Sequence, residues 1–171
     1  MADERMFGGR TIERDGVVRF RLPADWTIRM EEHEGHAVTA FDAPGGGTLR
    51  LVTDRVTPPR AGEGGTAVLL REMALRFVRP DDPRCGDRVV EDRPGGGLIA
   101  SAVLRTDEDG RTTWHGHAEA HYLWMLGAEQ GGRVAAAMFS FALSTAQDGE
   151  EAAVAAIGTA DAAIRAAAFP L

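Results

Sequence analysis

Residues 111–125, RTTWHGHAEAHYLWM, bring together several of the side chains in this chain that could bind a metal ion, transfer a proton or contact a ligand. They include three of the five histidines, two of the three tryptophans and the only tyrosine. Polar and apolar residues alternate along the segment, which predicts a β-strand whose successive side chains point to opposite faces. One face then carries four possible metal ligands: His115, His117, Glu119 and His121.

A metal site is one interpretation of this histidine-bearing face. Residues two apart on a strand lie about 6.5–7 Å apart, so His115 and His117 can converge on one zinc or other divalent transition-metal ion. A third ligand would be Glu119 or His121, which reach less easily, or His33 or His36 from a neighbouring strand. The simpler interpretation is a polar strand face in which histidine and glutamate bond each other, and no cofactor is then required.

The opposite face of the same segment is aromatic. Trp114, Tyr122 and Trp124 share it with two small residues, Ala118 and Ala120. Aromatic side chains act as anchors in ligand pockets and partner surfaces, so these three are candidate binding residues. The alternative is that they pack in the core beneath a helix.

Motifs of the common enzyme classes are missing from the sequence. There is no Gly-x-Ser-x-Gly, no dinucleotide-binding fingerprint, no phosphate-binding loop and no paired zinc-binding motif. These absences favour binding over enzymatic catalysis. The single cysteine, Cys85, sits in a loop-like stretch and is expected to be an unreactive thiol.

The hydrophobic pattern predicts an α+β protein. Period-two segments predict an antiparallel β-sheet of about six to eight strands, and two segments of helical period predict two main helices, 66–79 and 148–169, packed on it. Residues 133–144 are apolar on both faces, which is typical of a central strand covered on both sides. The length suits a single α+β domain over residues 1–171, with residues 1–9 as a frayed leader.

The composition bears on partners and on location. A formal net charge of −7 disfavours nucleic acid and anionic lipid as partners. No segment approaches the ~20 apolar residues needed to span a bilayer, so we expect no membrane insertion. The first residues lack the apolar stretch of a signal peptide, which predicts a cytoplasmic protein. The oligomeric state does not follow from the sequence.

Two motifs resemble the PsbP-like α/β fold superfamily, which holds photosystem extrinsic subunits, a nuclear Ran-release factor and bacterial proteins of unknown role. They are VVRFRLPADW at residues 17–26 and AAAMFSFALS at residues 135–144, the latter leading into the last helix. The resemblance implies an antiparallel sheet with helices packed on it, and implies binding or chaperoning more than catalysis.

We therefore expect a non-catalytic binding module, adaptor- or chaperone-like, that engages a protein or peptide partner through its sheet surface. The alternative is a metal-binding protein or small metalloenzyme that uses the strand face of His115 and His117.

Overall fold

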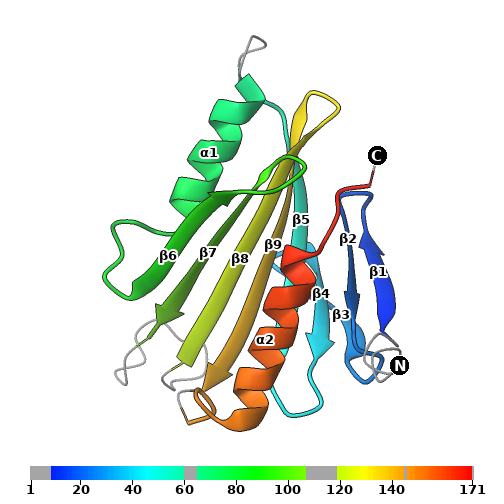
Figure 1. The fold of residues 1–171 in the computed structure, drawn as a ribbon, viewed down its shortest axis with the longest axis vertical. Coiled ribbons are helices and arrows are strands. Elements are labelled where there is room, and N and C mark those ends of the chain that lie inside the picture. The colour runs from blue at the N-terminus through cyan, green and yellow to red at the C-terminus, as the bar shows by residue number, and fades with distance from the viewer. Residues whose placement is uncertain (1–8, 60–64, 107–118, 145, 171) are drawn as a thin grey trace.

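The computed structural model describes residues 9–59, 65–106, 119–144 and 146–170. These residues form nine strands and two helices (Figure 1). In chain order they are β1 (Arg10–Arg14), β2 (Val18–Leu22), β3 (Thr27–His33), β4 (His36–Asp42), β5 (Thr48–Val56), α1 (Gly65–Phe77), β6 (Cys85–Asp92), β7 (Leu98–Arg105), β8 (Glu119–Gln130), β9 (Arg133–Ser144) and α2 (Glu151–Arg165).

Seven of the described strands make one antiparallel sheet in the order β3-β4-β5-β9-β8-β7-β6. The remaining two, β1 and β2, form a separate hairpin. The α+β class and the two main helices are confirmed, and the main sheet has a strand number within the predicted range. β9 lies at the centre of the sheet, as the apolar character of both its faces predicts.

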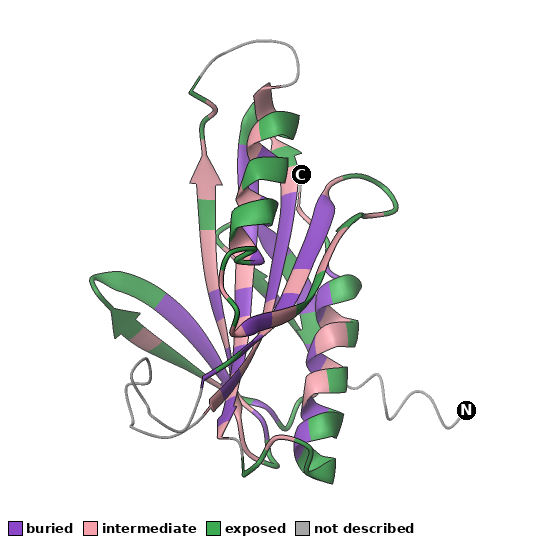
Figure 2. Ribbon diagram, turned by 90° about the vertical axis from the view of Figure 1, so that its left-hand side faces the viewer, coloured by how far each residue is buried: buried purple, intermediate pink, exposed green. Residues whose placement is uncertain are grey.

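The two helices cover opposite faces of the sheet. Alternate residues of each strand point to opposite faces, and they belong to two separate apolar clusters, each of which includes one helix. Tyr122, Trp124 and Leu126 of β8 belong to the cluster that includes α2 and the β1–β2 hairpin. Leu123 and Met125 belong to the cluster that includes α1. We call these two sides the α2 face and the α1 face (Figure 2).

The Leu-Pro-x-x-Trp segment forms a packed corner on the α2 face. Phe20 makes edge-to-face contacts with Phe41 at 5.7 Å and Phe139 at 5.4 Å between ring centroids. The ring of Trp26 lies 6.3 Å from that of Phe141, and all these rings are buried. Each large apolar side chain buried in this way contributes roughly 1.5–3 kcal/mol, so this corner fastens the small hairpin to the main sheet.

Helix α2 is shorter than the predicted 148–169. Its start is delayed by a turn in which the amides of Gln147 and Asp148 bond the carbonyl oxygen of Ser144, with Glu150 extended at the N-cap. It ends at Arg165, because Ala168 leaves the helix to exchange two 2.8 Å backbone hydrogen bonds with Arg19 of β2. This bridge ties the C-terminal segment to the small hairpin.

Cys85 is the first residue of β6 and not a loop residue. It is 4% exposed, and its thiol donates a hydrogen bond to the carbonyl oxygen of Val78 at 3.2 Å. The strand therefore begins four residues before Val89, the first of its two β-forming valines.

The close packing of α1 on β8 depends on Gly127. A Cβ at this position would lie 2.2 Å from Cδ1 of Leu70, so any larger residue requires the side chain of Leu70 to shift. We expect Gly127→Ala to lower the free energy of unfolding by about 1–3 kcal/mol, since Leu70 must move to make room. The measurement is urea denaturation followed by circular dichroism.

Gly86→Ala is the matched control for this prediction. Gly86 is also in a strand, and a Cβ there meets nothing within 4 Å. Its stability is expected to stay within about 0.5 kcal/mol of the wild type. Equal stability of the two variants would show that Gly127 is not needed for the docking of α1.

Candidate binding groove

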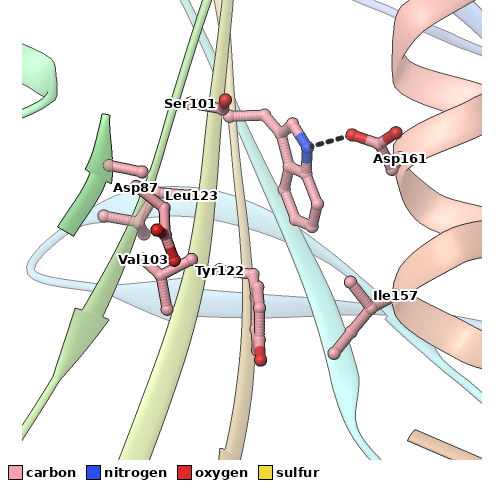
Figure 3. A pocket seen from close by; sticks show the side chains of 9 residues that line it. Asp87, Ser101, Val103, Tyr122, Leu123, Ile157 and Asp161 are labelled. Atoms are coloured by element: carbon pink, nitrogen blue, oxygen red, sulfur yellow. Dashed lines mark hydrogen bonds between the residues drawn. The ribbon is translucent and has the colours of Figure 1, made fainter. Parts of the chain in front are cut away.

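A groove of about 190 Å³ lies on the α2 face, between α2 and strands β6 to β8 (Figure 3). Ser101 and Val103 of β7 and Tyr122 and Trp124 of β8 line its sheet side. Ile157 and Asp161 line its helix side, and Asp87 of β6 lines its outer edge. The lining is therefore mainly apolar, with a carboxylate on each flank.

Strand pairing places the floor of this groove. Ser101 is paired with Trp124 and Val103 with Tyr122 across the β7–β8 ladder. Directly opposed residues on antiparallel strands point to the same face with Cβ atoms about 4.5–5.5 Å apart, so the four side chains form one surface. Trp124 is 4% exposed, and Tyr122 is only partly buried.

Asp161 joins the floor of the groove to α2. Its Oδ1 accepts a hydrogen bond of 3.0 Å from Nε1 of Trp124. The same carboxylate accepts hydrogen bonds from Nε of Arg165, one turn further along the helix. The buried indole N–H is thus satisfied by a charged partner, which fixes the ring and the helix relative to each other.

Tyr122 is held at the N-terminal end of α2. Its hydroxyl donates a 2.6 Å hydrogen bond to Oδ1 of Asp148, whose other oxygen lies 3.8 Å from Nε of Arg105. Burial, and secondarily the hydrogen bond to Asp148, raise the pKa of Tyr122. The side chain therefore stays a neutral phenol near pH 7 and serves as a hydrogen-bond donor, not as a base.

The C-terminal end of α2 is bridged to the β6–β7 turn by Arg93. Its guanidinium donates hydrogen bonds to the carbonyl oxygens of Ala167 and, at 3.2 Å, of Arg165. It also lies 5.9 Å from the ring centre of Phe169, and burial lowers its pKa. A cation at the last carbonyls of a helix is favoured by the helix dipole, so this contact helps to anchor the helix beside the groove.

Asp87 stands at the outer edge of the groove in an irregular part of β6. The β6–β7 register shifts between Gly86 and Val89, and Asp87 has φ 51°. β-Bulges change the direction in which a side chain points, and aspartate is one of the few residues that tolerate positive φ. Asp87 is exposed, and within the described part of the chain its carboxylate has no hydrogen bond or ion pair.

Among the described residues that line the groove, no hydrogen bond joins Ser101 to a carboxylate or a histidine. Ser101 is a nucleophile type, but of the described residues that line the groove none is a histidine. Asp161 and Asp148 are both engaged by other side chains. The arrangement presents an apolar floor and polar flanks, which suits binding.

The predicted site residues separate in the structure. Tyr122 and Trp124 lie side by side in the groove. Glu119 and His121 lie on the α1 face, where Nε2 of His121 is 3.0 Å from Oε2 of Glu119. Trp114, His115 and His117 lie outside the described residues, so their proposed roles stay predictions.

The metal-site prediction finds no support from the residues that can be placed. No group of three or more His, Cys, Asp or Glu suited to a metal ion occurs among the described residues. His33 and His36 pair in the β3–β4 hairpin, and β5 and β9 separate β4 from β8. Three strand spacings amount to about 14 Å, which is too far for His36 and His121 to share one ion.

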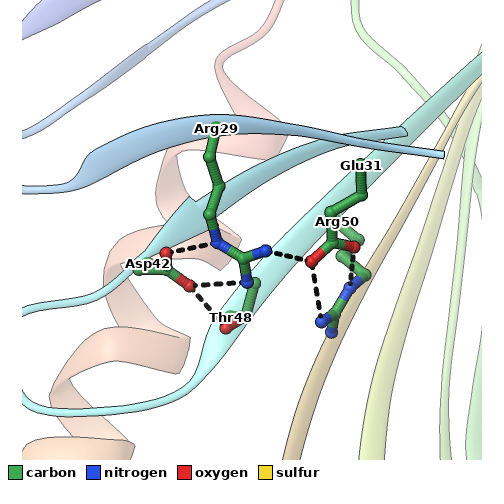
Figure 4. A network of polar contacts seen from close by, with 5 residues as sticks. All are labelled: Arg29, Glu31, Asp42, Thr48 and Arg50. Atoms are coloured by element: carbon green, nitrogen blue, oxygen red, sulfur yellow. Dashed lines mark hydrogen bonds and ion pairs between the residues drawn. The ribbon is translucent and has the colours of Figure 1, made fainter. Parts of the chain in front are cut away.

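The α1 face carries a second polar cluster, on strands β3, β4 and β5 (Figure 4). Arg29 donates hydrogen bonds to Asp42, at 2.7 Å, and to Glu31, and Arg50 donates to Glu31 at 2.9 Å. Thr48 donates to Asp42 at 2.7 Å. The arginine hydrogen bonds hold the pKa values of Glu31 and Asp42 below their usual range. Because these charged side chains are paired with one another, we interpret the cluster as a set of ion pairs that stabilises the packing of β3, β4 and β5 against each other.

No family model matches the sequence, and no curated protein matches it significantly. Several solved structures share its fold, and two of them illustrate the likeness. A protein from Bacteroides thetaiotaomicron has a TM-score of 0.60 and 17% identity, and the match covers 95% of this chain and 49% of that one. This chain therefore spans about half the length of the Bacteroides protein.

The second structure is LpqN of Mycobacterium tuberculosis, which is involved in cell envelope biogenesis. Its TM-score is 0.56 with 12% identity, and the match covers 100% of this chain and 97% of LpqN. At these identities the likeness shows a related α+β fold and nothing about function. It supports the fold implied by the sequence resemblance, while membership of the PsbP-like superfamily itself stays a prediction. No helix formed by the described residues is long and apolar enough to cross a membrane.

The Arg29–Glu31–Arg50 cluster predicts a stability effect that depends on pH. Since the folded pKa values of Glu31 and Asp42 are lowered, their contribution is present above the ordinary carboxylate pKa and is lost as the pH falls through the lowered values. We expect Glu31→Gln to lower the free energy of unfolding at pH 7 by about 1 kcal/mol and to flatten the acid side of the stability profile.

The neighbouring substitution Glu32→Gln serves as the control for urea unfolding at several pH values. Glu32 is exposed on the same strand and points to the other face. Its variant should keep the wild-type profile. A Glu31→Gln profile that coincides with the wild type would contradict a stabilising role for the cluster.

Tyr122 gives a direct spectroscopic test of the groove, because it is the only tyrosine in the chain. Ultraviolet absorbance titration of the folded protein should give a pKa above the ordinary value of about 10. Asp148→Asn should lower this pKa while leaving it above 10, since burial is the larger cause.

The chain unfolded in guanidinium chloride provides the reference for the titration, and its tyrosine should titrate near pH 10. Because the folded pKa is the higher one, the contribution of Tyr122 to stability is full below pH 10 and is lost as the pH rises through the folded value. A folded pKa at or below the reference would show that the phenol is not held as described.

Proposed function

We propose that this chain is a non-catalytic binding module that engages a protein or peptide partner, and that the partner inserts an apolar side chain into the groove between α2 and strands β6 to β8. The observation that carries the proposal is the floor of the groove, where Tyr122 and Trp124 stand together and are each fixed by a carboxylate near or on α2. Trp124 is 4% exposed and packs in the core, so Tyr122 is the ring that a partner can contact. A side chain fixed in this way binds with little loss of conformational entropy.

The size of the groove favours part of a larger partner over a free cofactor. Pockets for drug-sized ligands have volumes of roughly 300–1,000 Å³. A groove of about 190 Å³ accommodates one or two side chains. The remaining affinity must then come from contacts outside it, as expected for a peptide or protein surface.

Insertion into the groove is also favoured over extension of the sheet at its edges. Both edge strands of the seven-stranded sheet, β3 and β6, carry several charged side chains. The edge strand β6 also contains a bulge. Charges and bulges are devices that prevent the pairing of an additional strand, so the partner is more readily bound through side chains.

An adaptor- or chaperone-like role in the cytoplasm is the finer form of the proposal, together with membership of the PsbP-like superfamily. Its support is the sequence resemblance and the shared α+β fold. The shared fold with LpqN favours the cell envelope as the alternative location. In either compartment, the partner must present an apolar side chain that fits the groove.

The zinc alternative on His115 and His117 has no positive observation behind it. Of its four ligands, the two that the structure describes, Glu119 and His121, are engaged with each other. Their side chains are 16% and 27% exposed.

Selection of peptides from a random library on the immobilised protein tests the proposed function. We expect enriched peptides to shift the nuclear magnetic resonance (NMR) signals of Val103, Tyr122 and Trp124, with no change at α1. Ile157→Asp should weaken their binding at least tenfold, because it places a carboxylate against the apolar wall.

The control is Val154→Asp on the outer side of the same helix. Val154 is 57% exposed, and the substitution introduces the same charge three residues away. This variant should bind as the wild type does. Enriched peptides whose shifts map to the cluster of Arg29 and Arg50, or equal binding by both variants, would overturn the proposal.

A further inference from the structure

Asp87 is the one groove-lining carboxylate without a partner among the described residues. The other lining carboxylate, Asp161, accepts hydrogen bonds from Trp124 and Arg165. At the end of the groove, Asp148 accepts from Tyr122 and lies near Arg105. The free negative charge at the groove is therefore concentrated at Asp87.

The guanidinium groups near the groove do not offset this charge. Arg165 is engaged by Asp161 and lies 3.9 Å from Glu91, and Arg93 donates to helix carbonyls. Arg105 faces Asp148. Arg88, the neighbour of Asp87, donates to the carbonyl oxygens of Val78, Arg79 and Asp82 instead. A cation arriving at Asp87 thus meets an unneutralised carboxylate.

The bulge in β6 gives this carboxylate its position. Residue 87 has a positive φ, a conformation that is uncommon for a residue other than glycine, and it falls at the register shift of the strand. In the groove, Asp87 and Val103 lie on the side of β6 and β7, and Ile157 lies on the side of α2, with Tyr122 between them (Figure 3). A segment bound in the groove therefore meets both the carboxylate of Asp87 and the ring of Tyr122, and aromatic rings themselves attract cations.

We propose that the bound segment is a peptide that places a lysine or arginine at Asp87, next to the apolar residue that enters the groove. This inference rests on the proposed function and specifies the chemistry of the occupant. The overall net charge of −7 also favours approach of a basic segment.

Blocked peptides that differ at one residue test this inference. Each contains a leucine for the groove, followed by lysine, glutamine or glutamate in an otherwise identical glycine–serine sequence. Binding is followed by NMR titration at low and at high ionic strength. We expect the lysine peptide to bind about three- to fivefold more tightly than the glutamine peptide at low salt, and the glutamate peptide to bind weakest.

Asp87→Asn should remove the preference for the lysine peptide over the glutamine peptide. Asparagine tolerates positive φ, so the bulge is expected to persist. Glu72→Gln is the control for loss of one carboxylate, because Glu72 lies on α1 at the opposite face. That variant should keep the preference.

The outcomes separate this inference from the proposed function. Equal binding of the three peptides at the groove in the wild type, or a lysine preference that survives in Asp87→Asn, would overturn the inference and leave the proposed function standing. Absence of shifts at the groove with all three peptides, together with failure of the library selection, would overturn both.

Discussion

Strands β8 and β9 are paired along the whole length of both, and each of their faces is buried under a different helix. A strand in this position has no freedom of register, because a slip of one residue would exchange all its side chains between the two faces. The alternation along β8 thus decides where each candidate residue lies. Tyr122 and Trp124 go to the α2 face, and Glu119 and His121 go to the α1 face.

Two features create the groove: the fixed register of β8, and the limited area of the sheet that α2 covers. The helix lies over β9, while β8, β7 and β6 continue the sheet to one side of it (Figure 1). The aromatic residues of β8 therefore stand at the margin of the helix and not beneath its middle. Asp148 and Asp161 bond their polar atoms there, so the aromatic side chains are fixed in place while one side of Tyr122 stays accessible.

Local patterns in the sequence were sufficient to predict much of this architecture. Period two predicted the division of residues 119–125 between two faces, and the apolar character of both faces of residues 133–144 predicted a central strand. Each of these features depends on neighbours within a few residues, which is why the sequence shows them.

Features that depend on distant residues could not be predicted in the same way. The partners of Tyr122 and Trp124 are 26 and 37 residues away, and nothing local in the helix sequence marks Asp148 and Asp161 as those partners. Nor does the sequence show which helix covers which face of the sheet. The loop-like stretch around Cys85 contains Asp87 and in fact includes the start of β6. It is charged and lacks β-formers, so its strand conformation depends on pairing with β7.

The account is tested most directly by a crystal structure of the chain bound to a peptide selected on it. The predicted result is an apolar side chain of the peptide in contact with Tyr122 and Ile157, and a basic side chain within 4 Å of the carboxylate of Asp87. A peptide that lies across Arg29 and Arg50 on the α1 face, or that pairs as an additional strand with β3 or β6, would contradict it.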